Sequence, residues 1–338
     1  MPAPNPDARS RWTVRLLESG EVRSAWDVFV SRSEQANPFT TTTWLESSAA
    51  ALDLHLDFWV VLKGQEWVSA VAMPHRHAMG RKWFRGLPLA AYSTVVHRER
   101  TSGHAASRES ERIEAGRALA QALSRNYRLI SLLLSPTLRD VRPWQWEGWT
   151  AKPRYTCVLG LDPLPVPTDS VRRHVRKCVE SGVRFDGAWD LDSFWGVFEE
   201  TRERQGFDVR LGRERFFGLA KSLKDAGLAW MATARTAPGE PVSSQIMLGM
   251  PGTPTAFMWL AGTRREQLAS GVSAWLMLEI ASELARRGHR QWDLCGADYP
   301  NVARFKSELG SALQPYFQVE SPRSTLESLA WRWKRRYA

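Results

Sequence analysis

A single carboxylate interrupts an otherwise apolar segment in the last quarter of the sequence. Asp293 stands within Gln291–Cys295, and the cations Arg304 and Lys306 follow in the next segment. Burying an isolated carboxylate is costly, so Asp293 is predicted to have a polar partner or a raised pKa. Three roles remain open for it: orienting one of these cations, accepting a proton from a reacting group, or serving as a structural ion pair or loop cap.

A basic segment with helical periodicity lies near the middle of the chain. The apolar residues of 169–181 recur on one face, and the rest of the surface carries four cations, Arg172, Arg173, Arg176 and Lys177. Like charges on adjacent turns repel one another unless they meet anions. Guanidinium groups grip phosphate through paired hydrogen bonds, so the segment is predicted to bind a phosphorylated substrate. The alternative is a solvated face with acidic neighbours.

The whole chain shares this basic character. Its 338 residues contain 46 lysines and arginines against 36 acidic residues, a net charge of +10. Such a charge attracts polyanions, a class that includes tRNA, nucleotide diphosphates, coenzyme A and anionic membranes. The 17 tryptophans, several of them beside arginines, suit stacking on bases as well as packing.

Several common chemistries lack their sequence signatures. The three cysteines are scattered, and His75 and His77 have no companions at metal-ligand spacing, so no metal is expected. No nucleophile elbow, P-loop or dinucleotide fingerprint is present. Neither a signal peptide nor an apolar run of about 20 residues is found, which predicts a cytoplasmic protein.

The elements that must position these residues are clearest in the second half. Alternation and turn residues predict three strands, then a helix with apolar residues four apart, then a short buried strand. In order these are 228–235, 242–250, 255–262, 272–287 and 291–295.

The first half repeats this order of elements. Strands are predicted over 56–62, 66–74, 87–97 and 129–135, with a helix over 109–125 before the last of them. A pattern repeated after some 160 residues indicates a duplicated domain. The proline-broken segment 162–167 cannot continue regular structure. We therefore expect an N-terminal domain over 1–150 and a C-terminal domain over 151–338.

Four stretches together resemble the tandem-GNAT acyltransferase superfamily, which includes the Fem-type peptidoglycan-bridge aminoacyltransferases. One runs from Asp140 to Thr156 and resembles an inter-domain strand, and another is the basic helix with Ser181-Gly182-Val183. The others are Thr201–Gly206 and the closing block of Gly288, Trp292-Asp293 and 304–310.

The resemblance implies a fold and a reaction class. The fold is α/β (α+β), with two GNAT-like domains, each a mixed, mostly antiparallel sheet flanked by helices. The reaction is N-acyl transfer, in which an amine directly attacks an activated acyl or aminoacyl group. The second domain is expected to hold the donor.

In a GNAT domain two neighbouring parallel strands splay apart, and the helix between them points its start at the donor phosphates. The matching positions for donor binding here are Trp259 on the first strand and Ser270, Gly271, Val272 and Ser273 at the helix start. The spacing from Gln267 to Gly271 departs from the usual phosphate signature, so the donor stays open among acyl-CoA, acyl carrier protein and aminoacyl-tRNA. No permanently bound cofactor is expected.

The resemblance also implies catalytic residues. In Fem-type relatives a lysine in the closing block is proposed to stabilise the negative charge of the tetrahedral intermediate, and Phe305-Lys306 stands at that position. Asp293 is expected to support it. Arg204 and Gln205, at the end of a predicted helix, are candidates to line the acceptor pocket beside the basic helix.

The acceptor is expected to be an amine on a small molecule, peptide or cell-wall precursor. Two alternatives stay open: tRNA-dependent addition of an amino acid to a peptidoglycan precursor, and a non-catalytic RNA- or membrane-surface-binding module. The basic, aromatic segment Leu326–Tyr337 suits an anionic lipid surface at the inner membrane face or an RNA, unless its apolar side chains dock onto the protein.

Overall fold

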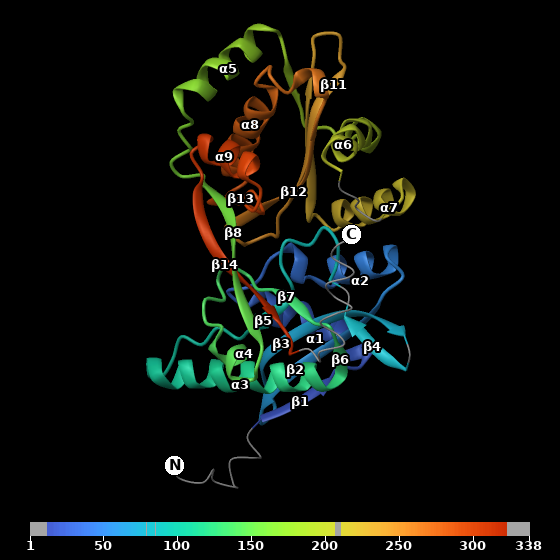
Figure 1. Ribbon diagram of the computed structural model, residues 1–338, viewed down its shortest axis with the longest axis vertical. Helices are drawn as coiled ribbons and strands as arrows, with labels where there is room; N and C mark the ends of the chain where they lie inside the picture. The colour runs from blue at the N-terminus through green and yellow to red at the C-terminus, as the bar shows by residue number, and fades with distance from the viewer. Residues whose placement is uncertain (1–11, 79, 85, 207–210, 323–338) are drawn as a thin grey trace. The chain divides into compact units, whose positions relative to one another are not determined.

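A computed structural model describes residues 12–78, 80–84, 86–206 and 211–322 (Figure 1). The chain forms two compact units. Unit 1 comprises residues 1–87, 92–153 and 316–338, and unit 2 comprises 88–91 and 154–315. The division therefore lies between Pro153 and Arg154, close to the predicted boundary. Tyr316 and the residues after it are grouped with unit 1, whereas the sequence assigned them to the second domain. The predicted C-terminal helix, 326–337, lies outside the described residues.

Unit 1 contains a sheet in the order β1-β2-β3-β4-β6, with β5 paired to β3. The predicted hairpin is present, since β2 and β3 are antiparallel from Lys63 opposite Glu66 onward. Helix α3 packs its apolar side chains on this sheet. The elements are β1 (Trp12–Leu16), α1 (Ser19–Ser31), η2 (Pro38–Thr40), α2 (Thr42–Ala51), β2 (His55–Lys63), β3 (Glu66–Ala78), β4 (Arg81–Phe84), β5 (Val95–His97), α3 (Ala105–Asn126), β6 (Tyr127–Arg128), β7 (Ser131–Leu133) and α4 (Arg142–Trp146).

One predicted strand of unit 1 is wrong over most of its length. Of residues 87–97, only Val95–His97 form a strand. Pro88 has no N–H for a strand ladder, and Leu89 has a φ of 69°, in the left-handed region. Residues 88–91 instead belong to unit 2.

Unit 2 is built on the strand order β8-β13-β12-β11-β10-β9. Strands β10 to β13 lie within about two residues of the sequence prediction, whereas β9 was not predicted. The elements are α5 (Asp169–Glu180), β9 (Arg184–Asp186), α6 (Leu191–Gln205), α7 (Arg213–Asp225), β10 (Ala229–Arg235), β11 (Pro241–Leu248), β12 (Thr255–Thr263), η3 (Arg265–Gln267), α8 (Val272–Arg286), β13 (Gln291–Asp293) and α9 (Pro300–Glu308). Two further strands, β8 (Thr150–Gly160) and β14 (Ala312–Glu320), have residues in both units.

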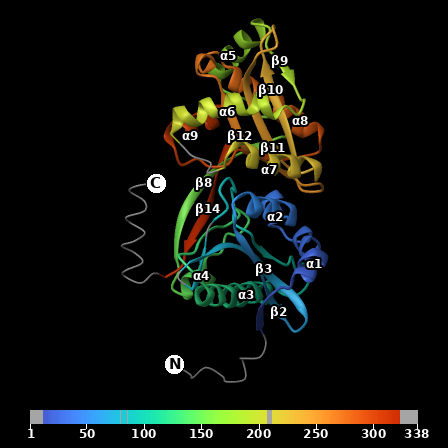
Figure 2. The same ribbon diagram turned by 90° about the vertical axis from the view of Figure 1, so that its right-hand side faces the viewer.

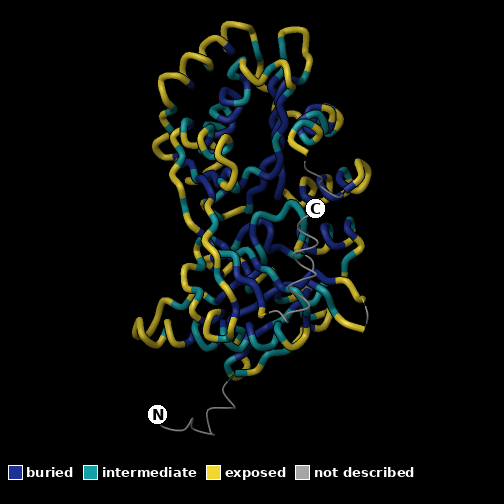
Figure 3. Tube along the Cα trace, in the orientation of Figure 1, coloured by how far each residue is buried: buried dark blue, intermediate teal, exposed yellow. Residues whose placement is uncertain are grey.

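Helices cover both faces of this sheet. Figure 1 shows α5 and α8 on one side of β11 and β12 and α6 on the other, and Figure 2 shows α6 crossing the strands. On the α8 side, apolar residues of α5, α8 and the strands form one core. On the α6 side, a Cβ at Gly262 would lie 2.8 Å from backbone atoms of Val197 and Phe198, so glycine permits the close approach of α6. β11 is buried continuously from Val242 to Leu248 (Figure 3).

Local sequence sets the helix ends in this layer. The Asp190 carboxylate caps α6 by accepting a hydrogen bond of 3.0 Å from Ser193 N. Gly206 closes α6 with a φ of 66°. Thr168 caps α5 in the same way as Asp190 caps α6. These caps fix where α5 and α6 begin relative to the strands.

Candidate active site

The edge between β12 and β13 opens partway along the strands. The two strands run parallel and stay paired only as far as Phe257 opposite Asp293. β13 ends there, whereas β12 runs on. Immediately beyond, Met258 and Leu260 pair with consecutive residues of β11, so Trp259 is an extra residue in a β-bulge. Past this point β13 supplies no backbone partner to β12, and the free strand edge can bind an extended ligand.

The start of α8 faces the same end of the sheet, because α8 follows directly after β12. The Ser270 hydroxyl accepts a hydrogen bond of 3.2 Å from Val272 N and donates one of 2.7 Å to Gln267 O. The N–H groups of the first turn, including those of Ser273 and Ala274, have no partners within the helix. Together with the helix dipole they favour an anion.

Gly271 brings α5 against the start of α8. It has a φ of 83°, and a Cβ at this position would lie 2.8 Å from the backbone of His174 in α5. Both the conformation and the contact require glycine here. The four cations predicted to bind phosphate flank His174 and are exposed. Arg172 pairs with Asp169, and among the described residues Arg173, Arg176 and Lys177 form no ion pair.

Lys306 is buried rather than solvated, with 4% of its surface exposed. Its Nζ donates hydrogen bonds to three consecutive carbonyls in the loop after β13, at 2.8 Å to Leu294 O, at 2.6 Å to Gly296 O, and to Cys295 O. An ammonium has three N–H groups, so all of them are engaged. Burial lowers the pKa of Lys306, while the nearby Asp293 acts to raise it. No N–H of Lys306 is left over for an oxyanion.

The loop that Lys306 holds has an unusual backbone. Cys295 and Gly296 are both left-handed, with φ values of 52° and 60°. A left-handed conformation at a residue other than glycine is strained, so a surrounding interaction must hold it. Burial raises the pKa of the Cys295 thiol well above its ordinary value. The thiol is therefore neutral and a poor nucleophile.

Asp293 has the polar partner that its burial predicts. It is 2% exposed, and its Oδ1 accepts hydrogen bonds of 2.5 Å from Thr156 Oγ1 on β8 and 2.8 Å from Cys295 N. The carboxylate therefore caps the loop that Lys306 also binds. Thr156 is 137 residues away in the sequence, which is why its role was not predicted.

The other predicted site residues lie around this core. The Trp259 indole is buried, donating to Leu89 O at 3.1 Å and packing on the ring of Phe216. Phe305 packs against the core beneath α8. Arg204 donates to Thr263 O at the end of β12, at 3.3 Å, and Gln205 is exposed beside it. Arg204 and Gln205 thus belong to α6, on the face of the sheet opposite α5.

Sequence reasoning missed a row of buried polar residues in β11. Ser243, Ser244 and Gln245 are all at most 1% exposed. Ser244 bonds to Thr233 at 2.8 Å, whereas Gln245 Oε1 has no hydrogen-bond partner among the described residues. The sequence signal that could have revealed them is the run of three polar residues inside an otherwise apolar strand.

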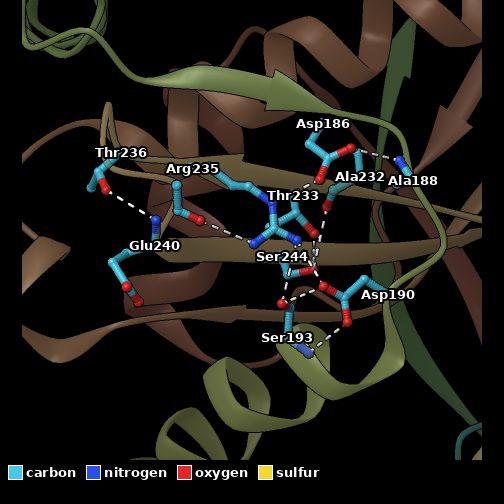
Figure 4. A network of polar contacts seen from close by, with 11 residues as sticks. Asp186, Ala188, Asp190, Ser193, Ala232, Thr233, Arg235, Thr236, Glu240 and Ser244 are labelled. Carbon is cyan, nitrogen blue, oxygen red and sulfur yellow. Dashed lines mark hydrogen bonds and ion pairs between the residues drawn. The ribbon is translucent and has the colours of Figure 1, made fainter.

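An arginine network braces the sheet edge next to α6 (Figure 4). The Arg235 guanidinium donates hydrogen bonds of 2.7 Å to Asp186 and 2.8 Å to Asp190. These contacts lower the pKa of Asp186, and hydrogen bonds from Ser193 and Arg235 lower that of Asp190 in spite of its burial. Because Asp190 also caps α6, the network joins β9, β10 and α6 into one rigid block.

A pocket of about 680 Å³ lies at the opposite end of the same sheet. It is formed by the turns before β12 and after α8, and it is lined by Trp230, Arg287 and His289 among others. The Arg287 guanidinium lies 4.5 Å from the Trp230 ring centroid. Here β12 and β13 are paired, so this pocket does not coincide with the strand opening. We place the candidate site at the opening because Asp293, Trp259 and the loop bound by Lys306 adjoin it.

Two features are absent from the described residues. No group of three histidine, cysteine, aspartate or glutamate side chains there is arranged to hold a metal ion. Among the helices of the described chain, none combines the length and the apolar character needed to cross a membrane.

Comparison with known proteins agrees with this architecture. Residues 168–307 match the acetyltransferase (GNAT) domain family, a range that contains α5, the strand opening and Lys306. No curated protein sequence matches the chain.

Several solved structures share the fold. FemX is 12% identical with a TM-score of 0.60, over 90% of this chain and 96% of that one. A tandem GNAT protein from the clavulanic acid biosynthesis pathway is 16% identical with a TM-score of 0.53, over 93% and 99%. The C-terminal domain of a putative lysylphosphatidylglycerol synthetase from Agrobacterium fabrum is 11% identical with a TM-score of 0.59, over 93% and 95%. The predicted tandem fold, with two sheets flanked by helices, is confirmed.

Proposed function

We propose that this chain, whose residues 168–307 match the acetyltransferase (GNAT) domain family, moves an acyl or aminoacyl group from a thioester or ester donor to an amine at the opening between β12 and β13. The observation that carries the proposal is the early end of β13 opposite Phe257, beyond which β13 no longer pairs with β12. An extended donor lying along that edge would present its carbonyl next to the loop that Lys306 holds.

The reaction balances without an enzyme-bound intermediate. The amine nitrogen bonds to the acyl carbon, and the bond from that carbon to the donor sulfur or oxygen breaks. The amine loses a proton, and the leaving thiolate or alkoxide takes one up. In between, negative charge develops on the acyl oxygen, and fixed donors at that oxygen lower the barrier.

We assign the stabilisation of this oxyanion to backbone N–H groups of β12 beyond Phe257, where β13 no longer pairs with it. The sequence suggested the Lys306 ammonium for this task, but its three N–H groups are bonded to carbonyls. Lys306 is better suited to position the loop 294–296, with the Asp293 carboxylate holding the same loop through Cys295 N. In this scheme both are positioning residues.

The donor phosphates would bind between α5 and the start of α8. Among the described residues, Arg173, Arg176 and Lys177 of α5 form no ion pair. They are near His174 in the sequence, and His174 contacts Gly271 at the start of α8. Coenzyme A, the phosphopantetheine arm of acyl carrier protein and the terminus of tRNA all carry phosphate. The exposed cations of α5 that form no ion pair among the described residues support a large polyanion, aminoacyl-tRNA, as a second candidate donor, with a peptidoglycan precursor as its acceptor.

A donor panel tests this proposal. The purified chain is incubated with acetyl-CoA, acylated carrier protein or aminoacyl-tRNA and a set of amines, and acylated amines are detected by mass spectrometry. Transfer from any donor supports the proposal, and loss of activity after ribonuclease treatment identifies tRNA as the carrier. Salt-sensitive RNA or anionic-vesicle binding with no transfer from any donor would instead establish a non-catalytic binding module.

A further inference from the structure

Gln245 lies at the centre of β11 and has a buried amide oxygen that nothing in the described chain bonds. The residue is 1% exposed, and Oε1 has no hydrogen-bond partner among the described residues. A buried acceptor without a hydrogen bond reduces the folding free energy, and natural folds contain few such groups. Such a group calls for a hydrogen-bond donor that comes from outside the chain.

The strand register shows which way Gln245 faces. It pairs with Ala232 of β10 and with Ala261 of β12, and paired residues of neighbouring strands point to the same face. Ala232 belongs to the core that α5 and α8 cover. Ala261 lies past Phe257, the last residue that β13 pairs. Gln245 therefore faces the helix α8 and lies one strand away from the opened edge of β12.

A neighbouring residue on the same face behaves differently. Ser243, two residues earlier in β11, is also buried, but its hydroxyl donates to Gly262 O at 3.0 Å and bonds to Thr263 Oγ1 at 2.9 Å. The layer between sheet and helices thus satisfies one polar side chain fully and leaves the next one unsatisfied. Burial alone does not account for this difference.

We propose that Gln245 determines donor specificity by accepting a hydrogen bond from the transferred acyl group. This inference rests on the proposed function and names its substrate class: acyl groups that carry an N–H or O–H next to the carbonyl, as in aminoacyl or hydroxyacyl donors. A simple alkanoyl group supplies no such hydrogen. A site built around a polar partner discriminates strongly against an analogue that lacks the group, because its own polar atom is then left unpaired.

The test compares acyl groups of nearly the same size on one carrier, coenzyme A or tRNA. Glycolyl and propionyl donors differ by a hydroxyl in place of a methyl, and a glycyl donor separates amine from hydroxyl recognition. Wild-type protein is expected to favour glycolyl or glycyl over propionyl by about tenfold or more in kcat/KM. The near-isosteric change Gln245→Met is expected to reduce that preference to within about threefold.

A second measurement needs no substrate. Gln245→Met removes the unsatisfied oxygen, so the ligand-free variant should melt about 2–4 °C higher than wild type. The matched control Ser243→Ala removes a satisfied hydroxyl and should melt lower. A lower melting temperature for Gln245→Met, or transfer with an unchanged glycolyl preference, overturns the role of Gln245 alone. Absence of transfer from every donor overturns the proposed function and this inference with it.

Discussion

Replacing Lys306 with methionine keeps the length of the side chain but removes the ammonium that three carbonyls share. Each carbonyl of the loop after β13 then loses a charged hydrogen bond, which contributes about 1.5–3 kcal/mol. This loss is partly offset, because the variant no longer buries an ammonium, whose desolvation costs several kcal/mol. The same desolvation lowers the pKa of Lys306 in the wild-type protein. Three lost bonds outweigh the desolvation that is relieved, so we expect a net loss of about 3 kcal/mol.

Arg304→Met is the matched control, because it removes a cation from the same helix. The Arg304 side chain is 82% exposed and forms an ion pair with Glu308 at 3.0 Å. An exposed pair of this kind contributes about 0.5 kcal/mol. Both variants and wild type are unfolded in urea, with the midpoint and slope compared, since the two units need not unfold together.

The same variant tests the positioning role in catalysis. At a temperature where Lys306→Met remains folded, turnover should fall at least tenfold, because the loop next to the acyl carbonyl is no longer fixed. Arg304→Met should keep the wild-type rate. If Lys306→Met unfolds at the same urea concentration as Arg304→Met, or retains full turnover, the loop does not depend on this lysine and the reasoning fails.

Three further changes test other parts of the site. Ser273→Asp places an anion at the start of α8. It should leave the folding stability unchanged or slightly higher, but raise the KM for the donor about tenfold. An unchanged KM in steady-state assays would exclude phosphate binding there. Gly271→Ala should cost more stability in urea than Gly288→Ala, since both glycines have positive φ but only Gly271 is in close contact. Arg235 lowers the pKa of Asp186, so the ion pair stabilises the fold above the unfolded pKa of about 3.9, and this stabilisation is lost as the pH falls below that value. Arg235→Leu should therefore make the urea midpoint depend less on pH between pH 3 and 6. An unaltered pH profile would contradict the network.

The elements of unit 2 were predictable because local signals agreed along the chain. The strand predicted over 255–262 is β12, Thr255–Thr263, and the helix predicted over 272–287 is α8, Val272–Arg286. Apolar spacing selected the element type and glycine or proline turns marked its ends. The strand predicted over 87–97 failed because its apolar residues do not all pack on one sheet, and residues 88–91 belong to the other unit.

The environment of each site residue was less predictable than its position. That Asp293 has a polar partner followed from its apolar neighbours, but the identity of Thr156 required the pairing of β8 with β13. For Lys306 the sequence indicated a cation near the reacting carbonyl. Its hydrogen bonds go to main-chain carbonyls, which every residue possesses, so no side-chain pattern could reveal them. Hydrogen-bond partners of this kind are a property of the folded loop alone.

The costly features of unit 2 gather at one end of its sheet, which bears on where the ligand enters. Three such features are the edge of β12 beyond its pairing with β13, the left-handed backbone of Cys295, and the Gln245 oxygen that has no partner among the described residues. In natural folds such violations concentrate where function requires them. The pocket of about 680 Å³ lies at the other end of the sheet, where β12 and β13 are paired. Polar groups without a partner in the described chain are therefore a better guide to this site than volume.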